Sequence, residues 1–286
     1  MSTGIIGSKA TLDLAKEELR KKRIMLPDYM SVLEDNMRGG IKQGCVVNLI
    51  GDTSVGKTTH VNSMAYHWIF NSPVKLGVVS LEATAGAYSL DLQSIHLGKN
   101  LMWYEDGEEA IEYMERPENQ AKIQDLLEDE DGDSRFQILD ERDGSLSVLE
   151  NQMQTLHKKH GCGVVVVDVL TDIIRSIGDD AQADHLMFQK RLTKEGSTVV
   201  NVLHTRKPPN TRDGVPQKAG EYDALGSGTI VQSGAINVVI NRNKMSKCPI
   251  ERNTTYADLV KCRNGLTGPA GEWYFDIETR RCYDRR

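Results

Sequence analysis

The sequence predicts an α/β domain with a mostly parallel central sheet, flanked by helices and ending in antiparallel strands. Three observations indicate this. From residue 41, short apolar runs of the kind buried on both faces of a sheet alternate with helical segments. One of these runs leads through a glycine-rich turn, at 51–58, into a helix. The last third has apolar runs joined by turns. We divide the chain into a linker helix at 1–25 and this domain at 26–286.

The linker segment 11–23, TLDLAKEELRKKR, has the pattern of an amphipathic helix. Leu12, Ala15 and Leu19 fall on one face, and two glutamates each precede a lysine by four residues. A helix this short is not stable alone in water, so it needs a surface to lie on. That surface is either its own domain or a neighbouring molecule, and the pattern fits both.

The expected elements of the domain follow in a regular order. Strands are expected at 45–50, 76–82, 133–140, 164–168 and 197–204. The helical segments are 58–70, a long acidic stretch before 133, and 145–161. The antiparallel strands are expected in 235–243, 256–264 and 271–277.

The composition is that of a soluble protein, with 39% hydrophobic and 27% charged residues. The net charge of −6 is unevenly distributed. Residues 105–143 hold sixteen acidic and four basic residues, which is −12, so the remainder carries +6. A cationic groove for nucleic acid is therefore not excluded. The acidic segment is either a docking face for a partner or a solvated excursion, and the second reading is favoured.

Other classes of protein are excluded by what the sequence lacks. It has no apolar run long enough for a membrane span and no signal-peptide pattern. Its five cysteines include no C-x-x-C pair, so we expect reduced thiols in a cytosol-like compartment, neither zinc ligands nor a disulfide framework.

The stretch GDTSVGKT fits G-x-x-x-x-G-K-[ST] and stands between an expected strand and helix. Its two glycines let the backbone curl so that N–H groups surround a phosphate at a helix N-terminus. Lys57 can then reach the outer phosphates, and Thr58 can offer its hydroxyl to Mg²⁺. The alternative is a glycine-rich structural turn. The predicted nucleotide-binding residues are Gly51, Asp52, Thr53, Ser54, Val55, Gly56, Lys57, Thr58 and Thr59.

Three further side chains are expected at the same edge of the sheet. Asp168 ends VVVVD and is predicted to hold the hydrated Mg²⁺, rather than only to cap a strand. Glu82 ends LGVVSLE and could polarise the attacking water, the alternative being a solvated strand-end acid. His204 ends STVVNVLH and could sense the terminal phosphate.

Two polar loops follow His204, at 205–218 and 226–234. The first has several cations and three prolines, and the second is rich in glycine. Long polar loops beside a catalytic edge are usually functional, and backbone amides in the second could grip phosphates. The alternative is a pair of solvated surface loops.

Near the end of the chain, KCRNGLTG carries two cations, Lys261 and Arg263, at alternate positions of an expected strand. Alternate side chains of a strand share a face, so both charges should point the same way. One reading is a charged edge strand that opposes aggregation. The other is a pair that meets an anion.

Taken together and in this order, these motifs resemble the ATPase domain of ring-shaped replicative DNA helicases of the DnaB type. The resemblance is nearest to the helicase half of the primase-helicases of short-tailed bacteriophages, and KCRNGLTG is its most specific part. It implies a RecA-like P-loop fold and a Mg²⁺-dependent motor driven by ATP, dATP or dTTP. It also implies a homo-oligomer, expected to be a hexameric ring, that moves on single-stranded DNA and unwinds duplex.

The resemblance also implies roles for individual residues. Lys261 and Arg263 would touch the terminal phosphate held by the next subunit, with Arg263 as the arginine finger. The linker helix would dock on the adjacent subunit. Arg242 and Phe275 would sandwich the base. The implied DNA contacts are Arg206, Lys207, Arg212, Lys218, Gly226, Ser227 and Gly228.

The sequence departs from the family at two DNA-contacting arginines, where it has Leu225 and Val231. No primase-like cysteine cluster is present, so we expect a separate primase, and a polymerase or loader as further partners, in the cytoplasm of a cell or virus host. The alternatives are a RecA-like recombinase or clock-type ATPase ring, and a non-unwinding helicase loader or scaffold.

Overall fold

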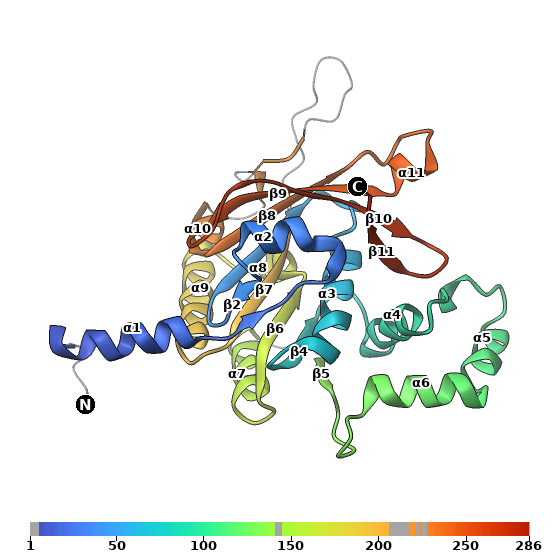
Figure 1. Ribbon diagram of the computed structural model, residues 1–286, viewed down its shortest axis with the longest axis horizontal. Coiled ribbons are helices and arrows are strands. Elements are labelled where there is room, and N and C mark those ends of the chain that lie inside the picture. Colours follow the sequence, from blue (N-terminus) through green and yellow to red (C-terminus); the bar gives the residue numbers. More distant parts are fainter. Residues whose placement is uncertain (1–5, 141–144, 206–217, 221–222, 225–227, 286) are drawn as a thin grey trace.

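The computed structural model describes residues 6–140, 145–205, 218–220, 223–224 and 228–285 (Figure 1). Its main feature is a nine-stranded sheet with the strand order β11-β10-β9-β8-β3-β7-β6-β4-β5. The strands are β3 (Val46–Gly51), β4 (Lys75–Ser80), β5 (Phe136–Leu139), β6 (Cys162–Asp168), β7 (Thr198–His204), β8 (Ile236–Arg242), β9 (Thr254–Cys262), β10 (Gly268–Asp276) and β11 (Arg281–Asp284). A separate pair is formed by β1 (Arg23–Ile24) and β2 (Ile41–Lys42).

The predicted α/β class, with a mostly parallel sheet and antiparallel C-terminal strands, is confirmed. Six adjacent strands, from β8 to β5, pair in parallel, and β9, β10 and β11 continue the sheet in antiparallel pairs. One assignment was wrong. The expected antiparallel strand at 235–243 is β8, which pairs in parallel with β3 and antiparallel only with β9. Both β7 and β8 pair in parallel with β3, so β8 runs in the same direction as β7, which local patterning could not reveal.

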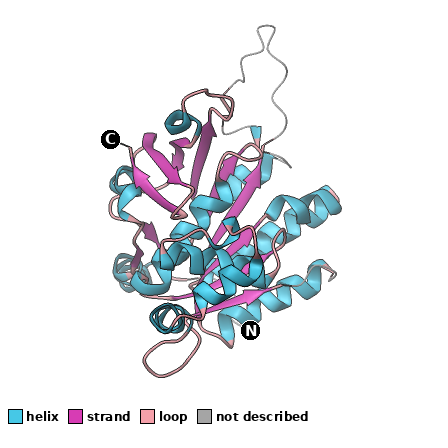
Figure 2. Cartoon of the chain, turned by 90° about the vertical axis from the view of Figure 1, so that its right-hand side faces the viewer, coloured by secondary structure: helices cyan, strands magenta, loops and turns pink. Residues whose placement is uncertain are grey.

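Helices cover both faces of the sheet (Figure 2). Alternation along each strand sends Val47 and Leu49 into one apolar cluster and Val46 and Ile50 into the other. The first face is covered by α2 (Ser31–Asn36), α3 (Lys57–Asn71), α4 (Ala85–Leu97) and α6 (Pro117–Leu127). The second is covered by α7 (Leu146–Lys158), α8 (Leu170–Ser176), α9 (Asp179–Lys194) and α10 (Gly228–Ser233). Both faces of the parallel strands are therefore buried, as their sequences predicted.

The register of the parallel strands brings the carboxyl ends of four strands to one edge. Gly51 at the end of β3 is the partner of His204 at the end of β7, and Ser80 of β4 is the partner of Asp168 of β6. This edge is where ligands bind in open α/β sheets.

The acidic segment forms α5 (Gly107–Met114) and α6 and then enters β5, beyond α4 and away from the centre of the sheet (Figure 1). Its helices bury only Ala110, Asn119 and Leu126. The short remaining helices are α11 (Pro249–Arg252) and the 3-10 turns η1 (Ser8–Ala10), η2 (Asp28–Met30) and η3 (Leu101–Trp103). Within the described residues, no helix is long and apolar enough to cross a membrane.

The linker helix α1 (Thr11–Arg20) projects from the domain (Figure 1). It buries none of its residues, and Leu19 is 83% exposed. Of the two surfaces that the sequence left open, its own domain therefore does not bury the apolar residues of the helix. The predicted ion pairs four residues apart also differ, because α1 ends at Arg20: Glu18 pairs instead with Lys21 at 2.7 Å and with Lys42 at 2.9 Å.

Candidate nucleotide site and a distant cation pair

The glycine-rich turn lies between β3 and α3, as the motif predicted. Gly56 adopts φ 101° as the residue before α3, and Ser54 also has a positive φ of 61°. A β-carbon on Gly51 would come within 2.8 Å of Val55 and 2.9 Å of Ile240. The tight curl therefore requires glycine at both motif positions, and it ends where the free N–H groups of α3 begin. Anions bind readily at such a helix N-terminus.

Lys57 is the first residue of α3, and it is only 5% exposed. Its Nζ donates to the carbonyl oxygen of Asp52 at 2.7 Å and to Nδ1 of His204 at 3.0 Å. Burial lowers the pKa of Lys57 to about 8, although Asp168 and Glu82 oppose that shift. A buried ammonium with two neutral acceptors is well placed to turn toward a phosphate.

His204 joins Lys57 to Glu82. Because Nδ1 accepts from Lys57, the ring proton is assigned to Nε2, which donates to Oε1 of Glu82 at 3.4 Å. Burial and the charge of Lys57 lower the pKa of His204, which favours this neutral form. We had expected Glu82 to end its strand, but it lies two residues beyond the end of β4. Its side chain is about half exposed. Lys57, His204 and Glu82 therefore form one chain of contacts.

Thr58 and Asp168 provide oxygen ligands beside this chain. Oγ1 of Thr58 donates to Oδ1 of Asp168 at 3.4 Å. Burial, with the nearby charge of Glu82, raises the pKa of Asp168 to about 7, so a cation here would favour its ionised form. Among the described residues no cluster of three or more His, Cys, Asp or Glu could hold a metal. The pair fits Mg²⁺, which commonly binds one or two protein oxygens together with water and substrate phosphates.

Sequence reasoning missed Lys244, which follows β8 on the other side of the turn. Its Nζ donates to Oδ2 of Asp52 at 3.0 Å and to the carbonyl oxygen of Thr53 at 2.6 Å. Thr255 adds a hydrogen bond from Oγ1 to the carbonyl oxygen of Val55 at 3.1 Å. No local signal could have found Lys244, because it reaches the phosphate turn only through the parallel pairing of β8 with β3.

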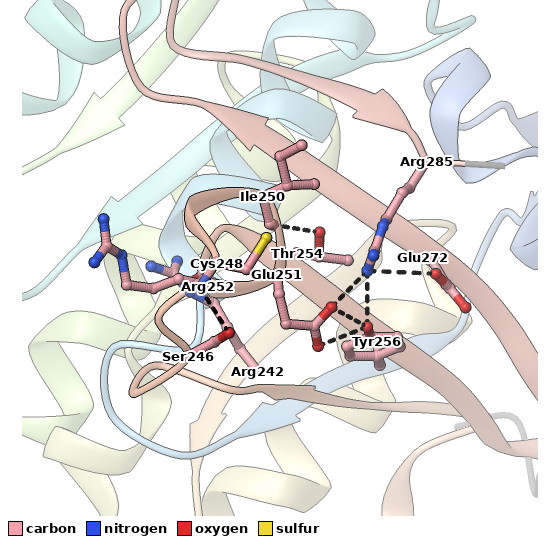
Figure 3. Close-up of polar contacts among 10 residues, drawn as sticks. All are labelled: Arg242, Ser246, Cys248, Ile250, Glu251, Arg252, Thr254, Tyr256, Glu272 and Arg285. Atoms are coloured by element: carbon pink, nitrogen blue, oxygen red, sulfur yellow. Dashed lines mark hydrogen bonds and ion pairs between the residues drawn. The ribbon is translucent and has the colours of Figure 1, made fainter.

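The proposed base-binding residues lie near each other but are engaged within the chain. Nε of Arg242 donates to the carbonyl oxygen of Arg252 at 2.6 Å, and the two residues lie together in Figure 3. The backbone N–H of Phe275 donates to Asn253, whose side-chain oxygen accepts from Arg242 at 3.4 Å. Phe275 is 7% exposed, with the guanidinium of Arg280 5.3 Å from its ring centroid. A base-binding role for the two stays a prediction.

Arg285, which follows β11, forms a cluster of polar contacts near Arg242 and Asn253. Arg285 contacts Glu251 and the hydroxyl of Tyr256, both at 2.8 Å, and Tyr256 also donates to Glu251 (Figure 3). The ring of Tyr256 lies 5.9 Å from Nζ of Lys218, one of the predicted DNA contacts.

The other predicted DNA contacts are largely outside the described residues, which is the case for Arg206, Lys207, Arg212, Gly226 and Ser227. Gly228 is described as the first residue of α10. The expected loop at 226–234 is thus helical from Gly228 to Ser233, where the apolar pair Ile230 and Val231 is buried against the sheet.

Lys261 and Arg263 lie at the edge of the sheet opposite the phosphate turn. The N–H of Arg263 donates to the carbonyl of Ala235, and the N–H of Ala235 donates to the carbonyl of Val46, the first residue of β3. Gly51 is five residues further along β3, so about 17 Å of strand separates the pair from its own phosphate turn. Neither cation belongs to the nucleotide site of its own chain.

The expectation that both cations lie in one strand was wrong. A register shift opposite Asn237 and a turn after Cys262 end β9 before Arg263, whose side chain is exposed. Lys261 remains in the strand, and its Nζ donates to the carbonyl oxygens of Val231 at 3.2 Å and Gln232 at 2.9 Å.

The fold and the phosphate turn define a P-loop nucleotide-binding protein, in which the oxygens of Thr58 and Asp168 fit Mg²⁺. The chain belongs to the DnaB-like helicase C-terminal domain family, which matches residues 29–281. This match confirms the predicted family, and a DnaB-like helicase domain implies the use of a nucleotide and Mg²⁺ in general.

Two known proteins are similar to this chain. The DNA helicase/primase of Enterobacteria phage T3 is 22% identical over 292 residues, covering 96% of this chain and 49% of that protein. The chain therefore spans about half the length of this curated relative. The solved ATPase domain of G40P superposes with a TM-score of 0.71 at 17% identity, covering 100% of both chains. The structural likeness confirms the predicted RecA-like ATPase fold.

Proposed function

We propose that this chain is the NTP-driven motor of a replicative DNA helicase. It assembles into a homohexameric ring, moves on single-stranded DNA and separates duplex. The single observation that carries this proposal is the division of its charged groups between the two edges of the sheet. Lys57, His204 and Glu82 lie at one edge, and Lys261 and Arg263 at the other. The family membership of the chain supports the same conclusion.

A divided site is completed when the cation edge of one copy faces the phosphate turn of the next. Such a head-to-tail contact closes into a ring if its rotation allows, and otherwise continues as a filament. The exposed helix α1 supplies a second contact, because its apolar residues find no surface on their own domain. Arg263 then stabilises charge on the neighbour's transferring phosphate, and Lys261 supports it.

Within each site, the residues at the carboxyl edge take separate roles. Lys57 leaves the carbonyl of Asp52 for the outer phosphates, and Thr58 and Asp168 hold Mg²⁺, which offsets phosphate charge when bound. Glu82 orients the attacking water and accepts its proton. His204 contacts both Lys57 and Glu82, so a change in the position of Lys57 alters the position of Glu82, the general base. The nucleotide is ATP, dATP or dTTP.

The partners follow from the same reading. Single-stranded DNA is contacted from α10 and from Lys218, and Gly228 at the start of α10 is the second proposed contact among the described residues. A separate primase, polymerase or loader works with the ring in the cytoplasm of the cell in which it acts.

A forked DNA substrate tests the proposal. With Mg²⁺ and a hydrolysable NTP we expect strand separation, and with a non-hydrolysable analogue or with Glu82→Gln we expect none. Electron microscopy with nucleotide and single-stranded DNA should give closed rings. Open filaments without unwinding would identify a recombinase instead, and nucleotide binding without turnover would identify a loader. Either result rejects the helicase.

A further inference from the structure

A row of buried amides crosses the central sheet below the nucleotide site. It consists of Asn201 in β7, Asn48 in β3 and Asn237 in β8, which we call the asparagine row. The strands are adjacent and the three residues are register partners. All three are 0% exposed. The register partner of Asn237 in the next strand, β9, is Lys261.

The hydrogen bonds of the row run in one direction, toward α10. Nδ2 of Asn201 donates to Oδ1 of Asn48 at 3.1 Å, and Nδ2 of Asn48 donates to Oδ1 of Asn237 at 2.9 Å. Nδ2 of Asn237 donates to the carbonyl oxygen of Val231 at 2.9 Å. Asn48 also donates to the carbonyl of Ile230 at 3.3 Å. Two adjacent carbonyls of α10 are thus bound by the row.

The same carbonyl of Val231 accepts from Lys261, which also binds the carbonyl of Gln232. Asn237 and Lys261 therefore meet at the C-terminal end of α10, where unpaired carbonyls and the helix dipole favour a cation. This short helix begins at Gly228, and the carbonyls near its C-terminal end bind Lys261.

At its far end the row continues into two helices on the same face of the sheet. Asn201 and Gln189 of α9 exchange side-chain hydrogen bonds at 2.9 and 3.0 Å. Gln189 donates to His185 at 3.1 Å, and His185 donates to Glu150 of α7 at 2.9 Å. Each amide of the row has partners on both its oxygen and its nitrogen, so the network is complete.

A stability argument alone does not explain the row. Burying an amide has a cost that hydrogen bonds only offset, and apolar groups of the same shape can be equally stable. The surrounding strands are filled with valine, isoleucine and leucine. Gly234 is fitted to the amides: a β-carbon there would lie 2.3 Å from Oδ1 of Asn237 and 2.5 Å from Nδ2 of Asn48. What directional bonds provide, and apolar contacts do not, is a fixed position for α10.

We propose that Asn48 and Asn237 are positioning residues that couple α10 to Lys261. This inference rests on the proposed function, in which Gly228 contacts DNA and Lys261 reaches the neighbour's nucleotide. The ammonium of Lys261 is held by α10 in this structure. Displacement of α10 by DNA releases it toward the phosphate of the next subunit, so DNA stimulates hydrolysis. The row sets the position from which α10 is displaced.

The test measures NTP turnover with and without single-stranded oligonucleotide, at protein concentrations where assembly is complete. The variants are Asn237→Leu and the double variant Asn48→Leu/Asn237→Leu. The single variant leaves a buried amide of Asn48 short of an acceptor and lowers the melting temperature. The double variant removes that amide, but it also takes the acceptor Oδ1 of Asn48 from Asn201, so it recovers only part of that loss. In both, we expect the ratio of DNA-stimulated to basal turnover to fall to about one, because the α10 contact is missing.

Asn201→Leu is the matched control. It removes an equally buried amide from the same row but no contact with α10, so it should lower the melting temperature and keep the stimulation ratio. A double variant with the wild-type ratio overturns the coupling, and so does an Asn201→Leu protein that loses stimulation to the same extent. If the wild-type protein hydrolyses NTP without stimulation by DNA, the proposed function is overturned together with the coupling. If only the variants give the unexpected ratios, the coupling alone is overturned.

Discussion

Arg263→Ala, combined with a second variant, tests whether the nucleotide site is shared between subunits. The strand β3 separates Arg263 from its own phosphate turn by about 17 Å, which is longer than an arginine side chain. Loss of an arginine finger lowers kcat by roughly 10³-fold or more, equivalent to about 4 kcal/mol of transition-state stabilisation. We expect Arg263→Ala to bind nucleotide normally and to show a loss of that size.

Mixing experiments separate a finger that acts on the neighbour from one that acts within its own chain. Lys57→Ala removes the phosphate contact but keeps Arg263, and each variant alone should be inactive. If subunits mix randomly at equal concentrations, roughly a quarter of the interfaces in a ring unite an intact Lys57 with a neighbour's intact Arg263. Turnover should therefore reappear in the mixture. Assembly is checked by light scattering, and mixed rings that stay inactive would refute the shared site.

Three other changes have defined outcomes. Glu82→Gln should lower kcat by about 10²–10⁴-fold with nucleotide affinity retained, measured by turnover and fluorescent-nucleotide titration; unchanged turnover would remove Glu82 from the base role. Burial lowers the pKa of His60 to about 3, so the folded protein resists its protonation, and stability present above pH 6.5 is lost as pH falls toward 3. At pH 5 this amounts to about 2 kcal/mol, which urea unfolding should detect in the wild type and find reduced in His60→Gln. An equal pH dependence in both proteins would contradict it. Deleting residues 1–20 should change the melting temperature little, because α1 buries no residue and the half-exposed Glu18–Lys42 pair is worth at most about 1 kcal/mol. The deletion should weaken assembly, measured by sedimentation. A truncated chain that assembles as before would exclude the linker role.

The parts of the site that could be predicted are those that lie within a few residues of a strand end. GDTSVGKT determines its own conformation, because the glycines, the strand before it and the helix after it are all local. Asp168 and His204 were placed correctly since parallel strands end at one edge. Glu82 was placed within two residues of its strand.

Other features depend on strand order, which no local pattern specifies. The strand β8 lies beside β3 in parallel, so Lys244 reaches the phosphate turn although nearly two hundred residues separate them in the chain. The same order aligns Asn201, Asn48 and Asn237, which in the sequence are three unrelated polar residues inside apolar strands.

The amino-acid sequence by itself determined the phosphate turn and the polar side chains that end the neighbouring parallel strands, because both are built from consecutive residues. Only the tertiary structure decided that Lys261 and Arg263 lie away from that turn. They do so because β9 joins the sheet antiparallel to β8, and this pairing carries the end of β9 to the opposite edge.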